Sequence, residues 1–320
     1  MRRGVGHWAI ALTALLGAVT APEARALMVY THESVMVPST TDGVPQDLPT
    51  ELYKPEGAGP FPAIVMLHDC SGLGSRSSGA PARWAQFLAT QGYVVAVPDS
   101  FTPRGFAGGV CSAPAGNATR KVDPLPRATD AFATLAYLRR QAFVDGAHVG
   151  VMGGSHGGST TLAVDATPVA AAPPAQNTRQ AFAAAIALYP GCAARYANWG
   201  VKRESGDHGK VVEFIGTYQA VTPLLILIGE KDDWTPAEHC RALAERAQAA
   251  GFPVTIKIYP GANHSFDNTS PQHYVADRRN ANAPDGRGAT TGGDPAAWKD
   301  AMQQVSAFFA RYLKAEAAAR

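Results

Sequence analysis

The stretch that decides the fold is residues 149–158, Val149-Gly150-Val151-Met152-Gly153-Gly154-Ser155-His156-Gly157-Gly158. An apolar run typical of a buried strand leads into a Gly-x-Ser-x-Gly turn, and helix-like residues 159–165 follow. Because Gly153 and Gly157 let the backbone crowd together without Cβ clashes, the turn predicts a nucleophile elbow that presents the Ser155 hydroxyl above a sheet. A Gly-rich turn that contains a serine can also be an ordinary loop, so the rest of the chain has to decide.

Two later strand ends carry the residue types that an elbow serine needs. The apolar run 223–228 ends in Gly229-Glu230-Lys231-Asp232-Asp233-Trp234-Thr235-Pro236, which places Asp232 or Asp233 at its carboxyl end. The alternating run 254–259 ends in Pro260-Gly261-Ala262-Asn263-His264-Ser265-Phe266, so His264 is the candidate base. A serine hydroxyl becomes a nucleophile when an imidazole takes its proton, and a carboxylate fixes the tautomer of that imidazole.

Each of these residues could also have a purely structural role. Asp233 suits the N-cap of the helix that begins near Pro236, and a single loop histidine such as His264 is usually structural. Three strand ends that carry three different residue types, in the chain order serine, acid, histidine, favour a catalytic triad over three coincidences.

The residues after a fourth strand predict an oxyanion hole, which is a set of hydrogen-bond donors for a negatively charged oxygen. Residues 63–67 form a buried-strand run, and His68-Asp69-Cys70-Ser71-Gly72-Leu73-Gly74 follows it. The backbone N–H groups of Cys70 and of His156, the residue after the nucleophile, are the expected donors to the oxyanion. The alternative is a structural loop after a central strand.

Strand-like runs alternate with helix-like runs along the chain, which predicts a mostly parallel sheet with helices on both faces. The runs begin near Ala63, Tyr93, His148, Ala183, Pro223 and Val254 and alternate with helices over 82–90, 129–140, 236–250 and 296–314. Residues 27–54 are expected to form an antiparallel edge, and 190–222 a small cap. The Ala/Pro-rich piece 166–175 indicates a surface loop, and 280–294 an irregular loop that is a candidate for the pocket rim.

These motifs resemble the dienelactone hydrolase family of α/β hydrolases, over most of the chain after residue 26. The likeness rests on the elbow and on four further segments: 68–72 after its strand, Val97-Pro98-Asp99-Ser100-Phe101, Gly229-x-x-Asp232 with Pro236, and Gly261-x-x-His264-Ser265-Phe266. The resemblance implies the α/β-hydrolase fold. It also implies Ser155 as nucleophile, Asp232 rather than Asp233 as acid, His264 as base, and Cys70 and His156 as oxyanion donors. Asp69 falls where the family often has a glutamate beside the nucleophile.

Two departures from the family pattern bear on the substrate. The founding enzymes use a cysteine nucleophile, whereas this chain has Ser155. They also hold the substrate carboxylate with two arginines; Arg104 lies near the first of these positions, but Asp267 and Asn268 stand where the second is expected. These departures argue against dienelactone as the substrate. Arg104 is kept as a substrate-binding candidate beside its alternative, a surface loop arginine.

Aromatic residues near the predicted site suggest an apolar acyl or aryl pocket. The candidates are Phe101, Phe106, Tyr189, Trp199, Trp234 and Phe266. Most of them could simply pack under loops, and Trp234 and Phe266 join Asp69 and Arg104 as the substrate-binding candidates.

The first 26 residues predict an export signal. Arg2 and Arg3 precede an apolar run over 8–19 that is too short to span a membrane, and Ala24-Arg25-Ala26 supplies the small residues that a signal peptidase reads. We therefore expect a signal peptide over 1–26, a single α/β domain over 27–320, and a periplasmic or secreted protein. Removing residues 1–26 takes the formal net charge from +2 to zero, which gives no reason to expect nucleic acid or an anionic membrane as partner.

The four cysteines, Cys70, Cys111, Cys192 and Cys240, predict two disulfides in an oxidising compartment. The sequence alone allows three pairings. In the α/β-hydrolase fold the strands before Cys70 and Cys111 are neighbours, as are those before Cys192 and Cys240, so these two pairs are expected. A metal site is the alternative interpretation of the four cysteines, but no two of them have the close Cys-x-x-Cys spacing of a zinc knuckle. No metal or organic cofactor is expected.

Together these features predict a serine hydrolase that cleaves small carboxylic esters through an acyl-enzyme. One rival is an α/β-hydrolase peptidase, although such enzymes usually carry a further large domain for which this chain has no room. The other rival is a binding protein that keeps the fold without the chemistry, against which a complete triad argues. The sequence gives no oligomeric state.

Overall fold

The computed structural model describes residues 27–41, 43–114, 116, 119–166, 182–205 and 208–314. An eight-stranded sheet runs through the molecule in the order β1-β2-β4-β3-β5-β6-β9-β10. Only β1 and β2 at one edge are antiparallel to their neighbours; the other strands are parallel. The strands are β1 (Tyr30–Thr41), β2 (Val44–Pro55), β3 (Phe61–Leu67), β4 (Val94–Pro98), β5 (Val144–Gly154), β6 (Ala184–Leu188), β9 (Leu224–Gly229) and β10 (Val254–Tyr259).

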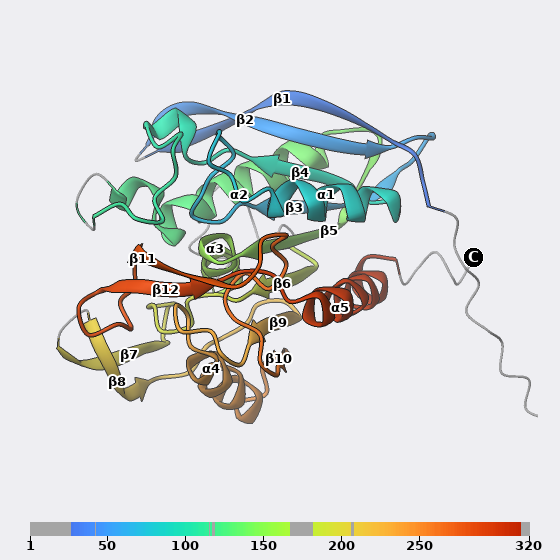
Figure 1. Ribbon diagram of the computed structural model, residues 1–320. Helices are drawn as coiled ribbons and strands as arrows, with labels where there is room; N and C mark the ends of the chain where they lie inside the picture. Colours follow the sequence, from blue (N-terminus) through green and yellow to red (C-terminus); the bar gives the residue numbers. More distant parts are fainter. Residues whose placement is uncertain are drawn as a thin grey trace, which may run out of the picture.

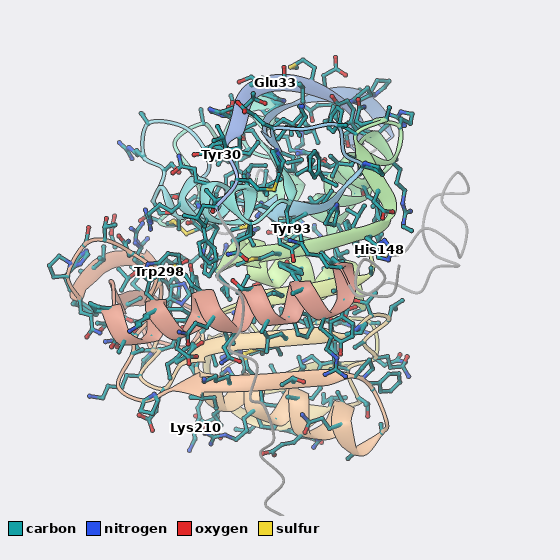
Figure 2. All side chains as sticks on the ribbon, turned by 90° about the vertical axis from the view of Figure 1, so that its right-hand side faces the viewer. Tyr30, Glu33, Tyr93, His148, Lys210 and Trp298 are labelled. Atoms are coloured by element: carbon teal, nitrogen blue, oxygen red, sulfur yellow. A yellow bond between two sulfur atoms is a disulfide. The ribbon has the colours of Figure 1, made fainter. Side chains whose placement is uncertain are left out.

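Helices cover both faces of this sheet, as expected for parallel strands that read as continuous apolar runs (Figure 1). They are α1 (Ala80–Thr90), α2 (Pro124–Arg139), α3 (His156–Asp165), α4 (Ala237–Ala249) and α5 (Pro295–Leu313). On one face α1 and α5 meet through the rings of Trp84 and Trp298, whose centroids are 4.5 Å apart. Figure 2 looks onto α5, with Trp298 near one end of the helix. This arrangement confirms the predicted α/β-hydrolase fold.

Two β-hairpins stand outside the main sheet, near the carboxyl ends of its parallel strands (Figure 1). The first pairs β7 (Gly200–Ser205) with β8 (His208–Ile215), and it occupies the segment for which a small cap was expected. The second pairs β11 (His273–Arg279) with β12 (Arg287–Thr291). The prediction of an irregular loop over 280–294 was therefore wrong in part, because β12 gains ladder hydrogen bonds from β11 that composition alone does not reveal.

The expected antiparallel edge is present, whereas one helix begins earlier than expected. The edge segment is a long hairpin of two twelve-residue strands, β1 and β2. Helix α2 begins at Pro124 rather than at residue 129, since a proline is tolerated in the first turn, where its missing N–H has no intrahelical partner. Residues 167–175 of the expected surface loop and the expected signal peptide over 1–26 lie outside the described residues. Within the described part, no helix is long and apolar enough to cross a membrane.

Candidate active site

Ser155 occupies the sharp turn between β5 and α3. Its backbone has φ 54° and ψ −115°, a left-handed conformation that costs a non-glycine residue free energy and recurs at functional sites. The Ser155 N–H donates to the carbonyl of Leu188 on the neighbouring strand at 2.9 Å. The serine side chain is thereby held at the carboxyl edge of the sheet, where only 7% of the residue is exposed.

The glycines of the turn are required by close backbone approach. A Cβ added to Gly157 would collide with the carbonyl oxygen of Leu67, at the end of β3. A Cβ added to Gly153 would collide with the backbone of Gly157. The Gly-x-Ser-x-Gly spacing is therefore a packing requirement of the bend, as the sequence predicts.

Hydrogen bonds join Ser155 to His264 and His264 to Asp232. His264 Nε2 lies 2.9 Å from Ser155 Oγ, and His264 Nδ1 lies 2.8 Å from Asp232 Oδ2. The histidine and aspartate side chains are almost fully buried. The Asp232 carboxylate also accepts from the backbone N–H groups of Trp234 and Thr235, at 3.0 and 2.8 Å. Three strand-end residues thus form one hydrogen-bonded chain in the order that acyl transfer uses.

Asp233, the alternative acid, points to a different part of the molecule. Its carboxylate accepts from the backbone N–H and the hydroxyl of Thr290 on β12, each at 2.8 Å. This carboxylate therefore ties the β11–β12 hairpin to the end of β9 and has no contact with His264. Of the two neighbouring aspartates, the structure brings Asp232 to the histidine.

Thr235 is a member of the site that the sequence did not single out. Its hydroxyl lies 2.9 Å from Asp232 Oδ2, 3.1 Å from His264 Nδ1 and 3.1 Å from the carbonyl of Tyr189. A hydroxyl has one proton to donate, so it donates either to the carboxylate or to the carbonyl. Its position three residues after Asp232, in a turn capped by that carboxylate, is the signal that would have found it.

Aromatic rings pack around the histidine. The rings of Tyr189 and Trp234 each have centroids 4.8 Å from the His264 ring. The Tyr189 hydroxyl donates to the buried carboxylate of Asp267 at 2.7 Å, and Trp84 Nε1 donates to the same carboxylate at 2.8 Å. Burial raises the pKa of Asp267 and, with that carboxylate nearby, the pKa of Tyr189. Tyr189 is therefore a neutral, fixed wall for the imidazole.

The two candidate oxyanion donors meet at this edge of the sheet. His156 is the first residue of α3, where a backbone N–H has no intrahelical acceptor. The N–H of Cys70 has no acceptor among the described residues. Both residues line the same cavity as Ser155. The backbone N–H groups of Cys70 and His156 therefore remain the candidate oxyanion donors.

Both disulfides lie at the site. Cys70 is bonded to Cys111, and Cys192 to Cys240, which is the expected pairing. The first bond ties the loop after β3, which carries the candidate oxyanion donor Cys70, to the loop that precedes α2. The second ties the loop after β6 to α4, so each disulfide closes a loop on the active-site edge.

The cavity at Ser155 has a volume of about 780 Å³, within the size range of small-molecule sites. Its wall comes from strand-end loops, from both disulfides and from the two hairpins, and includes Trp199, Val201, Ile215, Trp234 and Arg279. The non-glycine residues with positive φ in the described part of the chain are Ser155, Tyr189, Ala197 and Ser265; Ser155 and Ala197 line this cavity, and Ser265 follows His264. Part of the backbone strain of the described chain therefore lies at the cavity, as is usual for functional sites.

Of the four predicted substrate-binding residues, only Trp234 lines the cavity. The Arg104 guanidinium is buried in a two-pronged ion pair with Asp130, with N–O distances of 2.8 and 2.9 Å. Phe266 is fully buried between Tyr189 and Tyr259. These placements correct the expectation, because partners distant in sequence take up both side chains.

Asp69 is likewise absent from the cavity wall. Its carboxylate accepts from the N–H and hydroxyl of Ser71 and from the hydroxyl of Ser78. It therefore orders the loop after β3 instead of facing a substrate. Nowhere in the described ranges do three or more His, Cys, Asp and Glu residues form a group that could hold a metal ion.

Comparisons with known proteins agree on one protein family. The model of the Dienelactone hydrolase family matches residues 48–313. A Yersinia pestis protein named "Putative carboxymethylenebutenolidase" is 26% identical over 254 residues, which cover 75% of this chain and 80% of that protein.

Solved structures share the fold at low sequence identity. The structure of "Putative Dienelactone Hydrolase" from Klebsiella pneumoniae is 20% identical, with a TM-score of 0.61, and the match covers 89% of this chain and all of that one. Esterase 2 of Thermogutta terrifontis, phosphorylated by paraoxon, is 20% identical with a TM-score of 0.58, over 88% of this chain and 94% of that one.

Proposed function

This chain belongs to the dienelactone hydrolase family and is therefore a hydrolase, and we propose that it cleaves carboxylic esters of small molecules. The proposed reaction passes through an acyl-enzyme at Ser155. The observation that carries this proposal is the continuous hydrogen-bonded chain from Ser155 Oγ through His264 to Asp232. The family relationship supplies the reaction class, and the geometry supplies the residues.

In the proposed mechanism His264 Nε2 takes the Ser155 proton as Oγ attacks the ester carbonyl. Asp232 holds the Nδ1–H tautomer and stabilises the imidazolium that forms. The backbone N–H groups of Cys70 and His156 bind the oxyanion, each being worth on the order of 100-fold or more in rate. The imidazolium then protonates the leaving alcohol, and a water molecule activated by His264 releases the acid and restores the Ser155 hydroxyl.

Two observations favour esters over the rival functions. The strained backbone at Ser155 and the buried Asp232–His264 pair carry a free-energy cost that a binding protein would have no reason to keep. The T. terrifontis structure is described as an esterase phosphorylated by paraoxon. By analogy, an organophosphate is the suitable covalent probe for Ser155.

We also propose that residues 1–26 are a cleaved export signal and that the rest of the chain is one domain. Two disulfides support export, because such bonds persist mainly in oxidising compartments. Sequencing the amino terminus of the protein recovered from the periplasm or medium tests this; a start at Leu27 is expected, and recovery of the uncleaved chain from the cytosol would contradict it.

The test of the proposed activity uses p-nitrophenyl esters of increasing acyl length, with the oxidised protein. We expect nitrophenolate release that is blocked by a fluorophosphonate, and mass spectrometry should find the adduct on the peptide that contains Ser155. An unlabelled, inert protein would favour the binding-protein alternative. Cleavage of a peptide p-nitroanilide at a rate that matches the ester would favour a peptidase.

A further inference from the structure

Arg127 is a buried cation that the proposed mechanism does not use. It projects from α2, and none of its surface is exposed. Its Nη1 lies 2.7 Å from His156 Nδ1, and its Nη2 donates to the carbonyl oxygen of His68 at 2.9 Å. One guanidinium therefore contacts the residue after the nucleophile and the first residue of the loop that carries Cys70, which are the two arms of the candidate oxyanion hole.

An aromatic ring supports this guanidinium. The Cζ of Arg127 lies 5.0 Å from the centroid of the Phe101 ring, a cation–π distance. The same ring packs against His68 at 4.5 Å and against His156 at 5.6 Å between centroids. Arg127, Phe101 and the two histidines thus form one packed cluster behind the oxyanion donors.

The charge of Arg127 has no ion-pair partner among the described residues. The nearby carboxylate of Asp130 is taken up by Arg104, and that of Asp99 accepts from the backbone N–H groups of Phe101 and Thr102. Burial lowers the pKa of Arg127 to about 10, so the group still carries its proton at neutral pH. The carboxylates of Asp130, Asp69 and Asp99 favour the buried charge electrostatically without forming an ion pair with it. A further negative charge that develops nearby would therefore be stabilised by Arg127.

The contact to His156 fixes the tautomer of its ring. A guanidinium can only donate, so His156 Nδ1 accepts and the ring proton resides on Nε2. Burial, together with the neighbouring Arg127, lowers the pKa of His156, which keeps the ring neutral. The side chain of the residue that supplies one oxyanion N–H is therefore held in a single state.

Arg127 holds the backbone carbonyl of His68, and the side chain of the same residue reaches the peptide unit of the other donor. The backbone N–H of Ser100 donates to His68 Nε2 at 3.2 Å, so His68 Nδ1 carries the proton and donates to the carbonyl of Asp69 at 2.8 Å. That carbonyl shares a peptide unit with the Cys70 N–H. Because hydrogen bonds in series polarise one another, donation to the Asp69 carbonyl strengthens the Cys70 N–H as a donor.

We propose that Arg127 is a positioning residue for the oxyanion hole, which it holds through His68 and His156, and that its buried positive charge favours the negatively charged tetrahedral intermediate over the neutral ester. This inference rests on the proposed function and deepens it. It predicts an effect on the transition state and little effect on ground-state binding.

The test compares Arg127→Met and Arg127→Lys with Arg104→Met. Arg104 is also a buried arginine near the oxyanion loop, but it is paired with Asp130 and does not line the cavity, so it serves as the matched control. Rates are expressed per active site, titrated to completion with a fluorophosphonate, so that unfolded protein does not count. Thermal unfolding of each variant is recorded alongside.

We expect Arg127→Met to lower kcat about 10- to 100-fold and to change KM less than about threefold. This decrease in kcat is no larger than the one caused by removing an oxyanion donor. Arg127→Lys should recover part of the loss, since it keeps the charge without the planar fork. The inhibition constant of a trifluoromethyl ketone, which forms a tetrahedral oxyanion on the serine, should rise by the same factor as kcat falls. Arg104→Met should lower the melting temperature and leave kcat per site within about threefold.

A lower melting temperature in Arg127→Met, with kcat per site and the ketone inhibition constant unchanged, would show that Arg127 is only structural and overturn the proposal. Ser155→Ala separates this outcome from failure of the proposed function. If the Ser155→Ala protein hydrolyses the ester as fast as wild type, the site assignment falls, and the role of Arg127 falls with it.

Discussion

The proposed triad and the roof of the cavity are built in different ways. Ser155, Asp232 and His264 follow the parallel strands β5, β9 and β10, so their backbones are held by the central sheet. The roof, which we define as the hairpins β7–β8 and β11–β12, consists of two-stranded pairs outside that sheet (Figure 1). The difference teaches that the proposed catalytic residues are attached to the central sheet, while the shape of the cavity depends in part on hairpins outside that sheet.

The short segment after β9 joins these two regions. Asp232 turns inward to His264, whereas Asp233 binds Thr290 on β12. The indole N–H of Trp234 donates to the carbonyl of Arg279 at the end of β11, at 2.7 Å. Three consecutive residues thus connect His264 to the roof, and substitutions among them separate the two regions experimentally.

The largest effect is expected at the scaffold serine. Ser155→Ala should lower kcat by about a million-fold, as for other serine hydrolases, because no other group can attack. Ser159 is the matched control: it lies one turn further along α3, lines the same cavity, and its hydroxyl accepts from the Gly191 N–H. Ser159→Ala should retain kcat within about tenfold of wild type, far from the loss expected for a nucleophile. Equal loss in both variants would point to a general disturbance of α3.

The neighbouring aspartates give the next largest contrast. Asp232→Asn should lower kcat about 10⁴-fold, because the amide stabilises the wrong tautomer of His264. Asp233→Asn should mainly raise KM, since it loosens β12 while leaving the His264 contacts in place. Steady-state kinetics of both variants on one p-nitrophenyl ester make the comparison. Comparable losses of kcat would contradict the division between scaffold and roof.

The two disulfides sharpen the comparison further. They close loops of similar length, with sequence separations of 41 and 48, so replacing either pair by serines should lower the free energy of unfolding by a similar amount, about 2 to 4 kcal/mol. Only loss of the Cys70–Cys111 bond should also lower kcat, by about tenfold, because that bond holds the loop with the proposed oxyanion donor Cys70. Urea unfolding and kinetics below the transition measure the two effects separately. A larger kcat loss without Cys192–Cys240 would reverse the assignment.

The smallest effect concerns the far end of α3. Asp165 accepts from the N–H and hydroxyl of Thr222, on the segment that leads from the roof back to the sheet, and burial raises its pKa from 3.8 to about 6. The folded state therefore holds this proton more tightly than the unfolded state. The stabilisation, roughly 3 kcal/mol, is present below pH 3.8 and is lost as the pH rises towards 6.

Asp165→Asn should remove this contribution to the pH dependence. Urea unfolding of both proteins between pH 4 and 7 measures it: the free energy of unfolding of wild type should fall relative to that of the variant as the pH rises. Parallel curves for the two proteins would contradict the assignment of the raised pKa to Asp165.

Some features of the site could not be foreseen from the residues alone. Arg104 and Phe266 were expected to touch substrate, but Asp130 and two tyrosines bury them. Arg127 carried one overlooked signal: it lies on the stripe of α2 that also contains the buried Ala131 and Leu135, and a charge in such a stripe marks a buried polar contact.

The sequence by itself determined the parallel sheet, the family and the three strand-end residues that the structure brings into one hydrogen-bonded chain. It could do so because strand burial and the sharp elbow impose local patterns of apolar residues and glycines that survive in the linear chain. Only the tertiary structure decided that Asp233 binds Thr290, what becomes of Arg104, how residues 287–291 pair with β11, and that one buried arginine contacts both arms of the candidate oxyanion hole. Those outcomes depend on partners far apart in sequence, whose contacts exist only when the sheet and its helices have packed together.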